Sequence, residues 1–298
     1  MKVYDCFMFF DEELVLDIRL NILDKYVDYF VIVESKYNHK GEKRNLKFDK
    51  NKFYKFKNKI KYLIHDNLPS NIEKIEKTDS QNLIELKSSR NAAKRENFQR
   101  NFILKGLLDA NQEDIILVSD LDEIPNLSLI DLKNLKTKIT VFEQNFFYYK
   151  FDLYIPNFIW YGTKVIKMKD FISPQWARNI KCKKYPKYRI DILFNNTKFN
   201  NIEIIKNGGW HFSNIKTPEE IEVKYKSYLH HFEYEKSLLN LDEIKNFIKN
   251  KRAIYDLTAD KYEDKMGNGA YLKRFEQSLL PKFIQDNKQK FIKWFDQN

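Results

Sequence analysis

Residues 114–125 read DIILVSDLDEIP, and this segment indicates the class of fold. Its apolar run, Ile115–Val118, shows no polar alternation, which is typical of a strand buried on both faces in the middle of a parallel sheet. Asp120, Asp122 and Glu123 follow the run directly. Because ligands of open α/β sheets bind outside the carboxyl ends of the strands, we expect these acidic side chains to lie at a binding site.

The spacing of the two aspartates indicates a metal site. Asp120 and Asp122 are two positions apart, so in extended backbone their side chains point the same way. Two carboxylates in a dry site repel each other, and a divalent cation removes that cost. Oxygen ligands favour Mg²⁺ or Mn²⁺, which stabilise the charge on a departing nucleotide diphosphate. The alternative is an acidic turn, in which Asp122 or Glu123 accepts hydrogen bonds from free backbone N–H groups.

The elements before this stretch favour a parallel sheet. Residues 3–10 and 27–33 are apolar runs typical of strands, and residues 11–22 begin with acids and continue with helical apolar spacing. A strand–helix–strand order of this kind predicts a parallel pair. We also expect a strand at 60–64 and a helix over 88–110.

The second half of the chain is less regular. We expect strands at 139–147, 163–168 and 202–205, and helices over 217–232, 241–254 and 271–294. No internal repeat or linker divides the chain. The sequence therefore predicts one α/β unit, a Rossmann-type mixed sheet flanked by helices with a helical C-terminal portion.

Composition excludes several classes of protein. The chain has 298 residues, of which 43% are apolar and 15% aromatic, enough to bury a full core. Its formal net charge is +11, yet only nine of the 53 cationic residues are Arg. Phosphate and base recognition favours Arg forks, so we expect solvated Lys faces and no specific nucleic-acid partner. A module that binds RNA or an anionic polysaccharide is the alternative, and its binding would be steeply salt-dependent.

The cellular setting is predicted from what the sequence lacks. Cys6 and Cys182 are too few for a disulfide framework. No run of about 18 apolar residues is present, and the first residues lack a secretory cleavage pattern. We therefore expect a soluble, cytoplasmic protein. Any contact with a membrane would be peripheral.

Five blocks of sequence, in this order, resemble glycosyltransferase family 17. They are YDCFMFFDEELVLDIRLNIL (4–23), VDYFVIVES (27–35), RENFQRNFILKGL (95–107), DIILVSDLDEIP (114–125) and GGWHFS (208–213). That family includes the enzymes that add the bisecting β1,4-linked N-acetylglucosamine to N-glycans. The resemblance implies a GT-A-type fold, a UDP-sugar donor, a glycan, glycolipid or glycoprotein acceptor, Mn²⁺ dependence and inversion at the anomeric carbon.

The resemblance also implies a division of the chain. It covers roughly residues 3–235, so we expect a catalytic domain over 1–235. Within it, residues 1–125 would bind the nucleotide sugar, and 126–235 would bind the acceptor and complete the metal site. Residues 236–298 would form a helical extension packed on that domain.

The metal site and its neighbour are carried over from the matching blocks. Asp120 and Asp122 match the metal and diphosphate motif of the family, with Glu123 in support. His211 is the residue expected to complete the shell of Mn²⁺ or Mg²⁺. Trp210 beside it is a candidate for stacking on a sugar ring, with core packing as the alternative.

Four further residues are predicted to bind the nucleotide sugar. Glu34 closes the second expected strand. Arg95 or Arg100 would reach the diphosphate or position the acidic loop, and the alternative for Arg100 is a surface ion pair with Glu96 at helical spacing. Lys224 would meet a phosphate, although a solvated helical Lys is the plainer interpretation.

Further positions match the family less securely. His39 lies in a loop that resembles a family stretch. Ser227 and His230 fit a segment of helical spacing, in which Glu233 is displaced by one residue.

An inverting transfer needs a carboxylate to accept the proton of the acceptor hydroxyl. Four acids lie between the acidic motif and His211, and the sequence does not choose among them. We prefer Glu143 and Asp170, with Asp152 and Asp191 as the others.

A different enzyme class also starts from an apolar strand followed by D-x-D. In haloacid-dehalogenase-like phosphatases the first Asp, here Asp120, is a nucleophile, and Thr or Val stands two positions after the second. Here that position is Ile124, and Ser119 interrupts the junction between strand and Asp. The phosphatase is therefore the runner-up.

Overall fold

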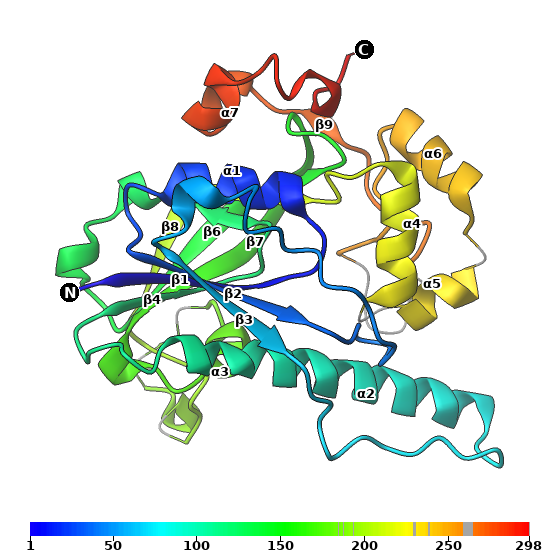
Figure 1. Ribbon diagram of the computed structural model, residues 1–298, viewed down its shortest axis with the longest axis horizontal. Helices are drawn as coiled ribbons and strands as arrows, with labels where there is room; N and C mark the ends of the chain where they lie inside the picture. The colour runs from blue at the N-terminus through cyan, green and yellow to red at the C-terminus, as the bar shows by residue number, and fades with distance from the viewer. Residues whose placement is uncertain are drawn as a thin grey trace.

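The computed structural model describes residues 1–183, 185–186, 188–192, 194–228, 231–237, 239–258 and 265–297. In this part of the chain, one mixed sheet of nine strands lies between two layers of helices (Figure 1). The predicted α/β class is confirmed. None of the helices in the described residues has the length and apolar composition needed to cross a bilayer.

The sheet has a parallel half and a mixed half. The strands are β1 (Val3–Phe9), β2 (Tyr29–Ser35), β3 (Ile60–His65), β4 (Ile115–Val118), β5 (Glu123–Pro125), β6 (Ile139–Tyr148), β7 (Leu153–Lys167), β8 (Ile202–Ser213) and β9 (Lys273–Arg274). Their order is β3-β2-β1-β4-β7-β6-β8-β5, with β9 paired to β7. The first four strands of this order are parallel, whereas β7 is antiparallel to both β4 and β6.

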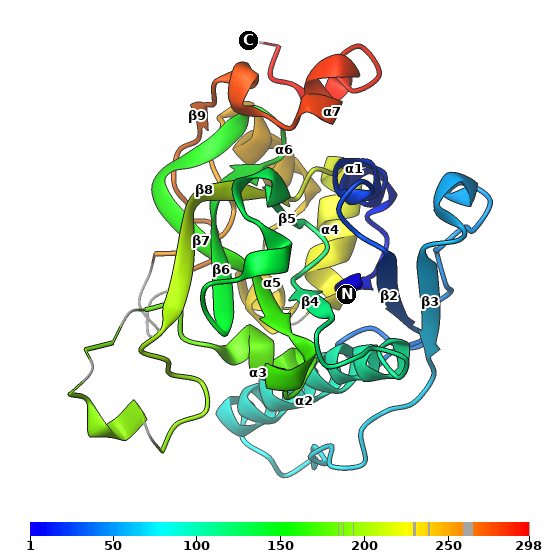
Figure 2. The ribbon, with the colours of Figure 1, turned by 90° about the vertical axis from the view of Figure 1, so that its left-hand side faces the viewer.

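Helices cover both faces and one end of the sheet. They are α1 (Glu13–Leu23), α2 (Gln81–Asn101), α3 (Pro174–Asn179), α4 (Pro218–Ser227), α5 (His231–Ser237), α6 (Leu241–Lys249) and α7 (Lys282–Asp286). Figures 1 and 2 show α1 and α7 on one face and α2 and α3 on the other. Figure 1 shows α4, α5 and α6 beside the sheet, near the ends of β2 and β3.

The strands expected in the first half are confirmed to within two residues. The parallel pairing of the first two is also confirmed, with Tyr4 opposite Tyr29. All four residues of β4 are buried, because β1 and β7 flank it and helices cover both faces. The expected helix over 88–110 is present but begins earlier, at Gln81, and ends at Asn101.

The second half departs more from the sequence expectations. Strands β7 and β8 are much longer than predicted, and β8 takes in the whole GGWHFS block. The long helix expected over residues 271–294 is wrong. Pro281 has no N–H to donate within a helix, and only the short α7 follows it. The segment is nevertheless part of the core, because Leu280, Ile284 and Phe291 pack with the buried face of α1.

The order of the parallel strands creates a crevice. The chain runs outward from β1 to β2 and β3, and α2 then returns it to β4 on the other side of β1. In doubly wound sheets, ligands bind at this switch point, outside the carboxyl ends of the strands. The loops after β1, β2 and β4 therefore meet at one edge of the sheet.

A buried arginine of α1 connects this edge to the sheet. The side chain of Arg19 is fully buried, and its guanidinium donates two hydrogen bonds to Asp5 of β1, at 2.8 and 2.6 Å. Arg19 also donates to the hydroxyl of Ser119, at 2.6 Å, and to the backbone carbonyls of Leu121 and Glu123, at 3.0 and 2.8 Å. The buried guanidinium of Arg19 thus holds the loop after β4 in place.

We expect Arg19→Met to destabilise the protein by about 3–5 kcal/mol, because it leaves the Asp5 carboxylate buried without its partner. Urea unfolding of wild type and variant measures the difference. Lys282→Ala is the control, since it breaks an exposed pair with Asp286 on α7 and should cost about 0.5 kcal/mol or less. An Arg19→Met variant as stable as the control would contradict the role given to Arg19.

Candidate functional site

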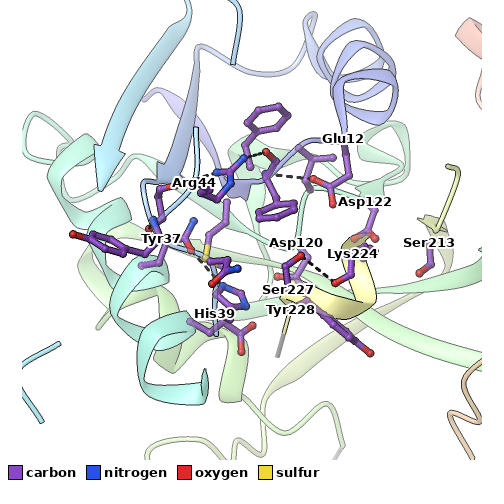
Figure 3. Close-up of a pocket in the computed structure, with 18 of the residues that line it drawn as sticks. Glu12, Tyr37, His39, Arg44, Asp120, Asp122, Ser213, Lys224, Ser227 and Tyr228 are labelled. Carbon is purple, nitrogen blue, oxygen red and sulfur yellow. Dashed lines mark hydrogen bonds between the residues drawn. The ribbon is translucent and has the colours of Figure 1, made fainter. Parts of the chain in front are cut away.

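A cavity of about 320 Å³ occupies the switch point. Its lining includes Glu12 after β1, Tyr37 after β2, Asp122 after β4, His211 of β8 and Lys224 of α4. In Figure 3, Tyr37 lies on one side of the cavity, and Glu12, Asp122 and Lys224 lie on the other. The predicted position of a binding site at the end of β4 is therefore matched by a cavity.

Asp120 is held by two arginines. Arg100 of α2 donates to its Oδ1 at 2.9 Å, and Arg178 of α3 donates to its Oδ2 at 3.1 Å. Burial alone would raise the pKa of Asp120, but the charges of Arg178 and Arg100 lower it well below its usual range. Each carboxylate oxygen thus accepts one hydrogen bond from an arginine, and the charge of Asp120 is balanced by the protein itself.

Glu123 shapes the turn from inside. Its fully buried carboxylate accepts the backbone N–H of Asp120 at 3.0 Å and the indole N–H of Trp160 at 2.6 Å. This is the turn-capping role considered for Glu123. The same turn leaves the side chain of Asp122 facing the cavity.

Asp122 and His211 converge. Strand β5 pairs with β8 so that Glu123 lies opposite His211, and the N–H of Phe212 donates to the carbonyl of Asp122 at 2.9 Å. As a result, His211 Nε2 lies 3.4 Å from Asp122 Oδ2. Burial would raise the pKa of Asp122, and the neighbouring imidazole lowers it below its ordinary value.

These two side chains fit a divalent cation that takes few protein ligands. Within the described residues, no group of three or more His, Cys, Asp or Glu side chains is arranged around a metal position. Asp122 and His211, however, both line the cavity and are mostly buried. Mg²⁺ and Mn²⁺ sites of this kind use one or two protein ligands and complete the shell with substrate phosphates and water.

Cations line two other parts of the cavity. Arg44 is fixed by an ion pair with Glu34 at 3.0 Å and by hydrogen bonds to the carbonyls of Ser35 and Phe10. Lys224 makes no ion pair with another described residue. Its charge lowers the pKa values of Glu12 and Asp122, and its side chain lines the cavity, where a ligand can contact it.

Glu34 does not line the cavity. It is fully buried, and its carboxylate binds Arg44, the backbone N–H groups of Lys47 and Phe48 at 2.6 and 3.1 Å, and the hydroxyl of Tyr62 at 2.8 Å. With both oxygens occupied, Glu34 anchors the following loop, and the nucleotide-binding role expected for it is not supported.

Arg95 and Trp210 also lie away from the cavity. Arg95 donates to the carbonyl of His39 at 3.0 Å and so supports the loop after β2. Trp210 packs in the core and donates to the carbonyl of Leu279 at 3.0 Å. Neighbouring residues of a strand face opposite sides, so His211 reaches the cavity and Trp210 cannot. The alternative of core packing holds for Trp210.

The two preferred bases are not at the site. Glu143 lies within β6, opposite Tyr161, and does not line the cavity. Asp170 follows β7, which runs antiparallel to β4, so it lies at the amino end of β4 and pairs with Lys138 at 3.3 Å. Asp170 therefore lies at the edge of the sheet opposite the cavity, whereas Glu143 lies toward the cavity edge but outside the lining of the cavity.

Some residues that the family resemblance raised fall at the site, and others do not. His39 and Ser227 line the cavity, and the pKa of His39 is lowered by burial. Arg100 reaches the site only through Asp120, as the loop-positioning alternative requires. His230 lies outside the described residues.

Several cavity residues were not found from the sequence, among them Glu12, Trp160 and Arg178. Glu12 had a usable signal, because it follows the first strand directly and must lie at the same edge as Asp120. Trp160 and Arg178 had none, since their partners Glu123 and Asp120 are 37 and 58 residues away.

This is a mixed α/β protein whose cavity and acidic loop lie at the switch point of its sheet, where open α/β sheets bind their ligands. The sequence model of glycosyltransferase family 17 matches residues 1–295. The chain belongs to this family and is a glycosyltransferase, which moves a sugar from a donor to an acceptor. No curated protein matches it.

We expect Asp120→Asn to lower the free energy of unfolding at pH 7 by about 2 kcal/mol, because two arginines lose a charged acceptor. The pKa of Asp120 is lowered in the folded state, so its contribution is present above about pH 4, the ordinary pKa of an aspartate. It is lost as the pH falls from there toward the lowered pKa. Unfolding curves from pH 7 to pH 3 should therefore show the gap between wild type and variant closing. A gap that stays constant would contradict the pairing.

Proposed function

We propose that the protein transfers a sugar, with inversion, from a UDP-sugar to a hydroxyl of a glycan, glycolipid or glycoprotein acceptor, assisted by Mn²⁺ or Mg²⁺. The donor sugar proposed is N-acetylglucosamine, as the family suggests, on a GT-A-type fold. The single observation that carries the proposal is the convergence of Asp122 and His211 on a cavity at the switch point of the sheet.

The chain's own residues would act on the donor in three ways. Asp122 and His211 would hold the cation, which when bound supplies Lewis-acid stabilisation of the departing diphosphate. Lys224 would pair with a phosphate, because it lines the cavity and has no ion-pair partner among the described residues. The loop after β2, with Tyr37 and Asn38, would border the nucleoside, since it closes the far side of the cavity.

A carboxylate of the cavity must accept the proton of the attacking hydroxyl. Glu12 and Glu96 line the cavity and are not assigned to the cation or to an acidic turn. Burial raises the pKa of Glu12, but Lys216 and Lys224 hold it below its ordinary value, so it is ionised at neutral pH. Glu96 pairs with Arg100. We propose that one of these two is the base.

The geometry disfavours the phosphatase alternative. A nucleophilic aspartate attacks phosphorus with a lone pair of its carboxylate, and pairing with two arginines lowers the reactivity of that carboxylate. Both oxygens of Asp120 accept hydrogen bonds from arginines, at 2.9 and 3.1 Å. Trapping an aspartyl-phosphate at Asp120 would restore that alternative.

We expect Asp122→Ala to lower the transfer rate by about 100-fold or more while the protein stays folded. Release of UDP from a panel of UDP-sugars, with Mn²⁺ present, measures the rate. Thermal unfolding with Mn²⁺ and UDP gives a second readout, because a ligand at 100 times its Kd adds about 2.7 kcal/mol to stability. The variant should lose most of this metal-dependent gain.

Asp286→Ala is the matched control, since Asp286 is exposed on α7 and far from the cavity. It should behave as wild type in both measurements. Undiminished transfer by Asp122→Ala, or a thermal gain from UDP that needs no divalent cation, would remove the cation from the proposal.

We expect either Glu12→Gln or Glu96→Gln to abolish transfer while donor binding, measured by calorimetry, stays within about threefold. The reason is that the amide keeps the shape of the side chain but cannot accept the proton. Glu143→Gln and Asp170→Asn serve as controls and should keep full activity. If both cavity variants stay active, the base lies elsewhere.

A further inference from the structure

One cationic side chain of the cavity, that of Arg178, is not used in the proposed transfer. Arg178 belongs to α3, lines the cavity and has a side chain that is 25% exposed. We infer that Arg178 is a catalytic residue, whose guanidinium contacts the diphosphate of the donor and stabilises the charge that develops there as the sugar departs. This inference rests on the proposed function and deepens it.

Three contacts fix the guanidinium of Arg178. Its Nη2 lies 3.1 Å from Asp120 Oδ2 and 3.7 Å from Glu123 Oε1. Its central carbon lies 5.5 Å from the ring centroid of Trp160, within reach of a cation–π interaction. Among the described residues, Nε and Nη1 have no hydrogen-bond acceptor. Arg178 is therefore oriented through one nitrogen and retains N–H groups for a ligand.

The other two arginines near the cavity are more fully engaged by the protein. Arg100 binds Gln175, Asp120 and Glu96 through its three nitrogens, and its side chain is only 2% exposed. Arg44 is occupied by Glu34 and by two backbone carbonyls. Among these three guanidiniums, Arg178 is the most exposed and the least engaged by protein acceptors.

The bond-breaking step requires a hydrogen-bond donor that is already held in place. In the transfer, the bond between the anomeric carbon and the β-phosphate oxygen breaks, and its electron pair stays on that oxygen. The acceptor oxygen forms the new bond to the anomeric carbon, and its proton passes to the cavity carboxylate. A preorganised N–H directed at the departing oxygen stabilises the new charge without reorganisation cost. Arg178 donates that hydrogen bond and is itself unchanged.

This inference separates the roles of the two aspartates. Asp122 faces the cavity beside His211, whereas Asp120 binds Arg178 and Arg100. Asp120 is then a positioning residue that aims Arg178 at the ligand. Trp160 is a second positioning residue, because it contacts the guanidinium and donates to Glu123, which holds the turn.

The test compares Arg178→Ala and Arg178→Lys with Arg189→Ala. Arg189 is a matched control, because it is an exposed arginine that pairs with Asp191 outside the cavity. Calorimetry measures the binding of UDP and of UMP to each protein, and UDP release measures kcat and KM. The activity of Arg178→Ala is also measured with added guanidinium chloride at millimolar, non-denaturing concentration. Thermal unfolding checks that each variant is folded.

We expect Arg178→Ala to lower kcat by about 100-fold and to weaken UDP binding by at least about tenfold. UMP binding should change by less than about threefold, because UMP lacks the β-phosphate. Guanidinium should restore part of the lost kcat in Arg178→Ala and none in wild type or Arg189→Ala. Arg178→Lys should recover part of the UDP affinity but less of kcat, because its point charge cannot reproduce the oriented fork.

Three outcomes would overturn the inference while leaving the proposed function intact: wild-type kcat in Arg178→Ala, equal losses of UDP and UMP affinity, or a loss of kcat that guanidinium does not relieve. A wild-type protein that neither binds UDP nor releases it from any UDP-sugar would instead overturn the proposed function.

Discussion

The buried guanidinium of Arg19 is the interaction on which the rest of the site depends. A cation without access to water is tolerated only when its partners repay the lost hydration, and here they are Asp5, Ser119 and backbone carbonyls of the acidic loop. The carbonyls must point inward to meet the cation, which turns Asp122 outward, toward the cavity. Helix α1, strand β1 and the loop after β4 are thereby fixed to one another.

A network of hydrogen bonds connects the loop after β4 to the wall of the cavity. Glu123 is buried over the turn and holds the N–H of Asp120 and the indole of Trp160. Asp120 in turn holds Arg178 at the cavity wall. Arg19 and Glu123 fix the backbone of the turn, and the ion pair with Asp120 fixes Arg178, so the polar groups reach the cavity with fixed directions. Electrostatic preorganisation of this kind is the largest contribution in many enzymes.

Local signals in the sequence were enough for the parallel half of the fold. The apolar run Ile115–Val118, the acids after it and the strand–helix–strand order before it specify a central strand and a site at its carboxyl end. Local signals did not predict the second half of the fold, where β7 and β8 bend through bulges and pair at long range. The expected helix over 271–294 had the right apolar spacing, but Pro281 interrupts the ladder, and burial against α1 decides the conformation instead.

The candidate site was predictable only where neighbours in sequence are neighbours in space. Asp122 follows its strand directly, but its partner His211 comes from β8, and Arg178 enters from a six-residue helix. These contacts also give the two aspartates of the D-x-D pattern different surroundings. With Asp120 neutralised by arginines, the repulsion that a pair of free aspartates would feel is already relieved. The positive charge of a cation bound at Asp122 would then balance mainly the charge of an incoming diphosphate, and less the charges of the two aspartates.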